Sequence, residues 1–208
     1  ADLNNDGFVD VYAANDFERN RVYLNNGAGD GMDPFLGVVG QPGGPDILGS
    51  TSVALGDVDK NGSIDAVIGN AIKRNRYYRN NGGLTPFLNT ETQDLTSAVL
   101  QTADIELVDI DNDGDLDALV GDRNGINRIH FNNSAPDNLF LDVPSSNLST
   151  NTWTSSAIAT GDVDNDGDQD LLIANAGTLT MGTATPLVNR PNIVFLNNGT
   201  PGPFALVS

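Results

Sequence analysis

Cysteine is absent from this chain of 208 residues, and long apolar runs are absent as well. Without cysteine the protein has no disulfide bonds, no thiolate zinc ligands and no cysteine nucleophile. No stretch approaches the roughly 18 consecutive apolar residues of a transmembrane helix, so the sequence predicts no membrane span.

Basic residues and glutamate are also scarce. The chain has 10 lysines and arginines against 28 acidic residues, and its formal net charge is −18. Such a surface repels phosphate backbones, so we predict that nucleic acid is not a partner. The only glutamates are Glu18, Glu91 and Glu106. The remaining acids are aspartates, and their clustering is more informative than the net charge.

The chain has a single histidine, His130, which alternates with Ile129 and Phe131 on a predicted strand. We interpret it as a packed residue and not as a general base, and without it no Ser-His-Asp triad can form. A glycosidase needs two carboxylates in a cleft, and the three glutamates show no pairing motif. We therefore predict that the protein is not an enzyme.

What the chain does contain is a repeat. Four aspartate-rich segments of nine residues, which we call loops 1 to 4, lie at 2–10, 57–65, 109–117 and 162–170. Their starts are 55, 52 and 53 residues apart, and each loop has Asp at positions 1 and 9 and Gly at position 6. An Asn-Asn pair begins 23 residues after the first Asp in three repeats and 35 after it in the fourth. Two landmarks in register indicate a repeat array along residues 1–208.

Short apolar runs predict strands and no helices. Strands buried on both faces are expected after the loops at 66–68, 118–120 and 171–174, and strands leading into loops at 51–55 and 105–110. Further strands are expected before the Asn-Asn turns at 22–24, 77–78, 129–131 and 193–196, with an outer strand around 34–35, 86–87 and 203–204. About four short strands per repeat is the period of a propeller blade. The predicted fold is all-β, a β-propeller array of about four blades of four short antiparallel strands.

The loops predict cation binding. Oxygen-bearing side chains at positions 1, 3, 5 and 9 can surround one point, and Gly at position 6 permits the sharp turn. Calcium takes six to eight oxygens in irregular geometry, whereas magnesium demands an octahedron and zinc prefers His or Cys. An EF-hand is excluded, because its Glu at position 12 is replaced by Ala13, Ile68, Val120 or Ile173.

We predict up to four structural Ca²⁺ ions, one for each loop. The predicted side-chain ligands are Asp2, Asn4, Asp6 and Asp10 in loop 1; Asp57, Asp59, Asn61 and Asp65 in loop 2; Asp109, Asp111, Asp113 and Asp117 in loop 3; and Asp162, Asp164, Asp166 and Asp170 in loop 4. Because Asn4 and Asn61 carry no charge, we expect the first two sites to be weaker. The alternative, four solvated turns without metal, leaves unexplained why 16 of the 28 carboxylates lie in these loops.

The pattern Asp-x-Asp-x-Asp-Gly-x-x-Asp, followed by an apolar strand and Asn-Arg-x-Tyr-x-Asn-Asn-Gly, resembles the FG-GAP/VCBS repeat family, whose blades also occur in the integrin α-subunit head. The resemblance covers nearly the whole chain. It implies a calcium-binding β-propeller, usually seven-bladed and extracellular or at the cell surface, used in adhesion, recognition or assembly. It also implies a backbone carbonyl ligand at position 7, which is Phe8, Ser63, Asp115 or Asp168. With about four repeats, we expect a larger chain or a neighbouring subunit to complete the propeller.

Three functional hypotheses stay open. The first is an extracellular adhesion or recognition module, made rigid by calcium, that binds a protein or polysaccharide ligand. The second is a structural subunit that assembles with copies of itself into a homo-oligomer or filament. The third is a carbohydrate-active enzyme, which requires uncommitted carboxylates in a cleft. Trp153 and the insertion at 177–191 are candidate parts of a binding surface.

Overall fold

All regular elements that the structure describes are β-strands. The structure is a computed structural model, and it describes residues 1–28, 35, 41–42, 49–88, 90, 92–95, 98–132, 134, 139–140, 146–148, 154–176, 191–199 and 205–207. This part of the chain contains no helix of the length and apolarity that a bilayer crossing requires. The predicted all-β fold is confirmed.

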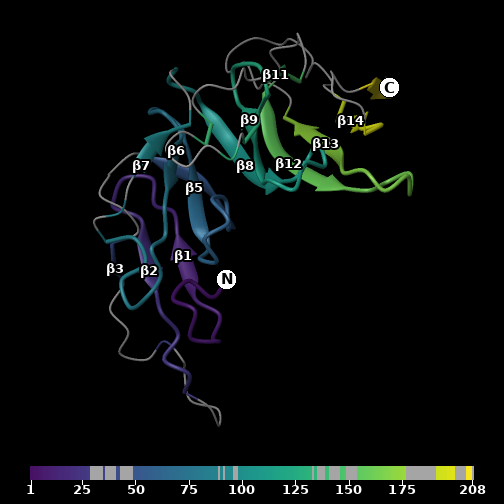
Figure 1. Ribbon diagram of the computed structural model, residues 1–208. Helices are drawn as coiled ribbons and strands as arrows, with labels where there is room; N and C mark the ends of the chain where they lie inside the picture. Colours follow the sequence, from purple (N-terminus) through teal and green to yellow (C-terminus); the bar gives the residue numbers. More distant parts are fainter. Residues whose placement is uncertain are drawn as a thin grey trace.

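The strands form four antiparallel sheets, blades 1 to 4, and within each sheet they lie side by side in chain order (Figure 1). Blade 1 comprises β1 (Val11–Ala13), β2 (Arg21–Tyr23) and β3 (Gln41–Pro42). Blade 2 comprises β4 (Ser50–Gly56), β5 (Asp65–Asn70), β6 (Arg76–Tyr78) and β7 (Thr92–Asp94). Blade 3 comprises β8 (Thr102–Val108), β9 (Asp117–Asp122), β10 (Arg128–His130) and β11 (Ser146–Asn147). Blade 4 comprises β12 (Ser155–Gly161), β13 (Asp170–Asn175), β14 (Ile193–Leu196) and β15 (Ala205–Val207).

The blades follow one another along an open arc (Figure 1). Strand β8 contacts β4 of the preceding blade and β12 of the following blade, so the first strands of blades 2 to 4 are neighbours. A closed propeller is not formed by the described residues, which agrees with the expectation that four repeats do not complete a ring.

One apolar core lies between each pair of consecutive blades, because alternate residues of a strand point to opposite faces. Ala66 and Ile68 of β5 pack with Tyr12 and Val22 of blade 1. Val67, between them, belongs instead to the core shared with blade 3. The prediction that the second strand of a blade is buried on both faces is therefore confirmed for β5, and the fully buried strand β9 confirms it again.

Two strand predictions are wrong. Pro86 and Phe87 lie in a turn, and the outer strand β7 begins only at Thr92. The physical reason is that Phe87 acts as a core anchor, since its buried ring meets Tyr12 edge-on at 5.4 Å. Strand β13 is not buried on both faces, because Leu172 is 41% exposed on the side where no further blade packs. Of the other predicted outer strands, Phe35 lies in a turn, whereas residues 34 and 203–204 lie outside the described residues.

Candidate metal centres

In blades 2 to 4 the aspartate-rich loop connects the first and second strands, and position 9 is the first residue of the second strand. Loop 1 leads directly into β1. Loop 2, for example, leaves β4 at Asp57 and enters β5 at Asp65. The sheet therefore fixes both ends of the loop. The antiparallel register repeats exactly from blade to blade, with Gly56 opposite Asp65 and Val108 opposite Asp117.

The loops share one backbone conformation. Position 4 has a left-handed φ of 59°, 56°, 59° and 62° in the four loops, at Asn5, Lys60, Asn112 and Asn165. The glycine at position 6 has a φ between 86° and 99° throughout. A Cβ at Gly62 would meet nothing within 4 Å, so glycine is required there for its backbone conformation and not for space.

Hydrogen bonds from backbone N–H groups to the loop's own aspartates stabilise each loop. In loop 2 the carboxylate of Asp57 accepts the backbone N–H groups of Asn61 and Gly62, both at 2.9 Å. The same pair of bonds forms in loops 1 and 4, and the bond from glycine recurs in loop 3. The side-chain oxygen at position 5 accepts the backbone N–H of position 7 at 2.8–3.0 Å; the acceptors are Asp6, Asn61, Asp113 and Asp166.

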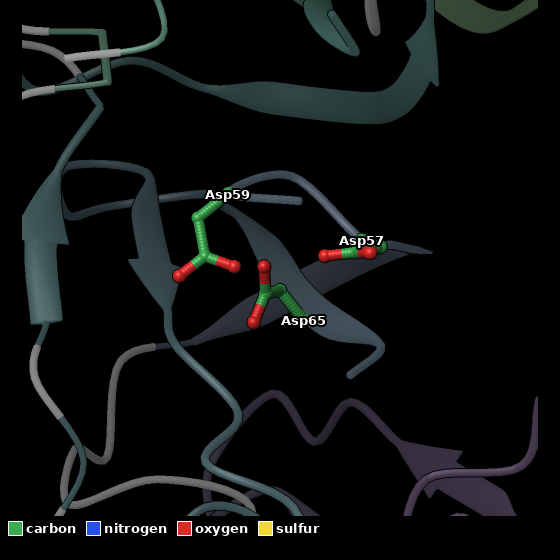
Figure 2. A group of neighbouring side chains, drawn as sticks. All are labelled: Asp57, Asp59 and Asp65. Atoms are coloured by element: carbon green, nitrogen blue, oxygen red, sulfur yellow. The ribbon is translucent and has the colours of Figure 1, made fainter. Parts of the chain in front are cut away.

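Carboxylates at positions 1, 3 and 9 converge in three of the loops, as Figure 2 shows for loop 2. Within each group the oxygen atoms lie within 4.8 Å of one another. The groups are Asp57, Asp59 and Asp65; Asp109, Asp111 and Asp117; and Asp162, Asp164 and Asp170. Loop 1 has only Asp2 and Asp10 for this set, because its position 3 is Asn4. The structure thus brings together three of the four predicted side-chain positions, and the aspartates at position 5 lie outside the converging groups.

The aspartate at position 9 is buried in every blade, and its two oxygens accept backbone N–H groups from two different elements. Asp65 accepts from Val58 at 3.0 Å and from Asn80 at 2.7 Å. Burial raises the pKa of Asp65 to about 6, and the charge of Asp59 adds to the rise.

Loop 3 shows the same effect more strongly. Burial raises the pKa of Asp117 to about 7, and the charges of Asp111 and Asp113 add to the rise. Buried carboxylates that repel one another are stabilised in their charged form by a bound cation. The donor set is all oxygen, so it fits a hard cation such as calcium.

At position 7 the side chain contacts the turn that contains the Asn-Asn pair. In all four blades it lies against the residue that follows the Asn-Asn pair: Phe8 against Gly27, Ser63 against Gly82, Asp115 against Ser134 and Asp168 against Gly199. This orientation leaves the backbone carbonyl as the group that position 7 can offer to a cation, as the family resemblance implies.

The FG-GAP-like repeat family matches residues 2–68, 57–120 and 109–173, and each match begins at one loop and ends in the second strand of the next blade. The chain belongs to the FG-GAP-like repeat family. No curated protein sequence matches it. Among solved structures 22 chains match, including "Crystal structure of BBS1N in complex with ARL6DN, soaked with lead". That match has a TM-score of 0.48 and 16% sequence identity, and it covers 84% of this chain and 49% of the other, so this chain spans about half of that one.

Sequence reasoning interpreted the Asn-Asn pair of these FG-GAP repeats only as a turn, and the structure gives its first residue a larger role. Asn132 donates its backbone N–H to Asp117 at 2.8 Å and its side-chain amide to the carbonyl of Val58 in the preceding blade at 2.9 Å. Asn80 and Asn197 make the same two kinds of bond. The constant spacing of 15 residues between the position-9 aspartate and this Asn in blades 1 to 3 is the signal that could have revealed it.

A second feature that the repeat pattern did not indicate is Arg79, one of four basic residues at 73–79. Its Nε lies 2.6 Å from Oδ2 of Asp59, one of the converging carboxylates of the second FG-GAP loop. Two nearby arginines, Arg74 and Arg76, instead pair with Asp94 at 2.7 and 2.9 Å. His130 is buried in β10, and Trp153 and most of the insertion at 177–191 lie outside the described residues.

Proposed function

We propose that this chain is an extracellular calcium-binding FG-GAP repeat module for adhesion or recognition, in which Ca²⁺ has a structural role. One observation carries the proposal: four loops repeat a single backbone conformation, and three of them hold three aspartate carboxylates within 4.8 Å of one another. Side chains at positions 1, 3 and 9 would hold the ion, with position 5 and the carbonyl of position 7 completing an oxygen shell.

The chemistry of the loops favours calcium over other metals. Histidine and cysteine are absent from all four loops, which removes the usual zinc ligands. Carboxylate, amide and carbonyl oxygens around one point suit the irregular geometry of calcium better than the strict octahedron of magnesium. Extracellular modules typically bind calcium with a Kd of about 10⁻⁴–10⁻³ M, so a Kd in this range would support the proposed location.

A structural role follows from the size of the expected effect. At calcium 100-fold above its Kd, one site stabilises the folded state by about 2.7 kcal/mol. Four such sites would add about 11 kcal/mol, which is comparable to the whole stability of a typical domain, about 5–15 kcal/mol.

Thermal unfolding in calcium and in EGTA tests the proposal. We expect the Tm to fall by on the order of 20 °C or more in EGTA, because 1 kcal/mol shifts a domain of this size by about 2–4 °C. Magnesium at the same concentration serves as the control and should restore little of the loss. An unchanged melting curve in EGTA would show that the loops are solvated turns without a structural metal.

We assign the module a binding function without catalysis. The loop carboxylates are committed to the backbone and to the proposed ions, and His130 is buried within the sheet. A reducing-sugar assay against soluble acidic and neutral polysaccharides tests this assignment, since calcium-dependent release of sugar ends would make the chain a carbohydrate-active enzyme.

Assembly with copies of itself is a second candidate function, and exposed end faces favour it. At position 2 of the loop, Leu3, Val58 and Ile110 are covered by the following blade, whereas Val163 of blade 4 is 60% exposed. Leu172 is exposed on the same end. Blade 1 exposes Val11, where the equivalent Ala66, Ala118 and Leu171 are buried against the preceding blade. The exposed residues of blades 1 and 4 are equivalent to residues that are buried between neighbouring blades. We therefore infer that blade 4 of one copy can pack against blade 1 of a second copy, head to tail.

Sedimentation velocity in calcium tests the assembly. We expect concentration-dependent dimers or longer chains of the protein, and a shift to monomers for the double variant Val163→Asp with Leu172→Asp. The control is Val99→Asp, compared with Val163→Asp alone, because each adds one negative charge at an exposed valine and only Val163 lies on the end face. A wild-type protein that stays monomeric at high concentration would remove this candidate and leave the binding module.

A further inference from the structure

Consecutive loops along the arc are joined by a buried hydrogen bond. The amide of Asn132, which is 3% exposed, donates to the carbonyl of Val58, and Val58 lies between Asp57 and Asp59 of loop 2. The backbone N–H of the same Asn132 donates to Asp117 of loop 3. One residue therefore connects a position-9 carboxylate of one loop with the segment between two carboxylates of the loop before it.

The same connection repeats between the other loops. Asn80 donates to the carbonyl of Leu3 at 2.7 Å and to Asp65 at 2.7 Å, which joins loop 1 to loop 2. Asn197 donates to the carbonyl of Ile110 at 2.7 Å and to Asp170 at 2.9 Å, which joins loop 3 to loop 4. In blade 1, where the structure has no preceding loop, Asn25 reaches only the carbonyl of Val9 in its own loop, at 3.2 Å.

A second, more exposed contact runs from position 4 of each loop to the next loop. Lys60 of loop 2 forms an ion pair with Asp115 of loop 3, and Asn112 of loop 3 donates to Asp168 of loop 4 at 2.6 Å. Asn5 of loop 1 donates to the carbonyl of Gly62 at 3.3 Å. The side chain of Lys60 is 54% exposed, so this ion pair is screened by water and salt and contributes little. The buried asparagine is the stronger of the two connections.

We propose that Asn80, Asn132 and Asn197 are positioning residues that couple neighbouring calcium sites, so that loading one site raises the affinity of the next. This inference rests on the proposed calcium function. A cation bound at loop 3 would order the carboxylate of Asp117. Asp117 accepts the backbone N–H of Asn132, and the side chain of Asn132 donates to the backbone between Asp57 and Asp59 of loop 2. Each site that is ordered lowers the entropic cost of ordering its neighbour, and the coupling is equal in both directions.

Site-resolved NMR titration with calcium tests the coupling. The amides of Gly62 and Gly114 each donate at 2.9 Å to the first aspartate of their own loop, so each amide shift reports binding at its own site. Asp111→Ala removes an exposed carboxylate from the third site and leaves every contact of Asn132 in place. We expect this variant to raise the calcium midpoint of Gly62, in the second loop, by about fivefold or more, the lower end of typical coupling between sites.

Asn132 is then tested directly. In the background of Asn132→Ala, we expect Asp111→Ala to leave the midpoint of Gly62 unchanged. The matched control is Asn25→Ala, which removes the equivalent side chain where it joins no other loop, and which should preserve the full shift. Lys60→Gln should also preserve the shift, because the exposed ion pair carries little of the coupling.

Other outcomes separate this inference from the proposed function. If no glycine amide shifts with calcium in the wild-type protein, the calcium function fails and the coupling with it. If the amides shift but Asp111→Ala leaves the midpoint of Gly62 unchanged, calcium binds and only the coupling is overturned. If Asn132→Ala does not fold, Asn197→Ala in the last blade replaces it, with Asp164→Ala removing the fourth site and Gly114 reporting the third.

Discussion

At the level of single residues, a positive charge beside the second loop is the clearest departure from the repeat. Arg79 occupies a position that is Leu24, Phe131 or Leu196 in the other repeats, and its Nε lies 2.6 Å from Asp59. The positive guanidinium pairs with Asp59 in the loop without metal, and it would repel a cation that binds there. If loop 2 binds calcium as proposed, we therefore expect Arg79 to weaken this site in addition to the uncharged Asn61.

Replacing this arginine should strengthen the second site. We expect Arg79→Leu to lower the calcium midpoint of the Gly62 amide by about fivefold, since a partly exposed ion pair is worth on the order of 1 kcal/mol. The gain should shrink in high salt, which screens the charge. Arg74→Leu is the control, because Arg74 pairs with Asp94 outside the loops. An unchanged midpoint in Arg79→Leu would mean that the ion pair does not compete with calcium.

His130 gives the folded chain a dependence on acid that is separate from the loops. It is 5% exposed, and its Nε2 is a buried atom without a hydrogen-bond partner in the described part of the chain. Burial lowers its pKa to about 4, and the charge of Arg128 adds to the fall. Because the folded pKa lies below the ordinary value of about 6.5, the stabilising effect is complete above pH 6.5 and is lost between pH 6.5 and 4.

Urea unfolding of the wild type and of His130→Phe in saturating calcium measures this effect. Phe suits the position, since blade 4 has the buried Phe195 there. We expect the wild type to lose about 2 kcal/mol relative to the variant between pH 7.5 and pH 5, as follows from a shift of about 2.5 pKa units. Titration of the loop carboxylates is common to both proteins and cancels. A constant difference between the two pH values would show that His130 titrates normally in the folded state.

At the level of elements, the sequence predicted the first three strands of blades 2 and 3, whereas β1 and β12 were not predicted. Apolar runs and turn residues predicted β5, β9 and β14 closely, because these strands are marked by local composition. The outer strand β7 has the sequence Thr-Gln-Asp with no apolar residue, so periodicity offered no signal for it. The exposure of Leu172 could not be predicted either, because its sequence matches that of a buried strand and it is exposed only because no blade packs on it in the described part of the chain.

The second strands of blades 3 and 4 provide a matched test of how much this neighbour contributes. Leu119 in β9 is fully buried, whereas Leu172 occupies the same register position in β13 and is largely exposed. We expect Leu119→Ala to lower the free energy of unfolding by about 2–5 kcal/mol through the cavity it leaves. Leu172→Ala should cost less than about 1 kcal/mol, because its side chain is already in contact with water. Urea unfolding in calcium measures both, and equal losses would show that another surface covers Leu172 in solution.

At the level of the whole molecule, the sequence showed the repeat, but it did not show the polar contacts that join one blade to the next. Sequence spacing located all four loops and the residues that converge in them. It could not show that Asn132 reaches Val58, 74 residues earlier, because this contact depends on how two blades pack and not on local composition. Likewise, the sequence indicated Asp115 only as an additional charge in loop 3. In the structure its carboxylate forms an ion pair with Lys60 and accepts a hydrogen bond from Ser134.

The open arc predicts a gradient of stability along the chain. In a repeat array each blade is stabilised by its own contacts and by its interfaces, so blades 2 and 3, with a neighbour on both sides, should open less often than blades 1 and 4. The amides of Leu119 in β9 and Leu172 in β13 are suitable reporters, because both lie in strands that pair on both edges. We expect hydrogen exchange in calcium to be at least about tenfold slower for Leu119, which corresponds to about 1.4 kcal/mol of interface energy. Equal protection would mean that the four blades unfold as one unit, and that the ends are held by a partner or by calcium as firmly as the centre.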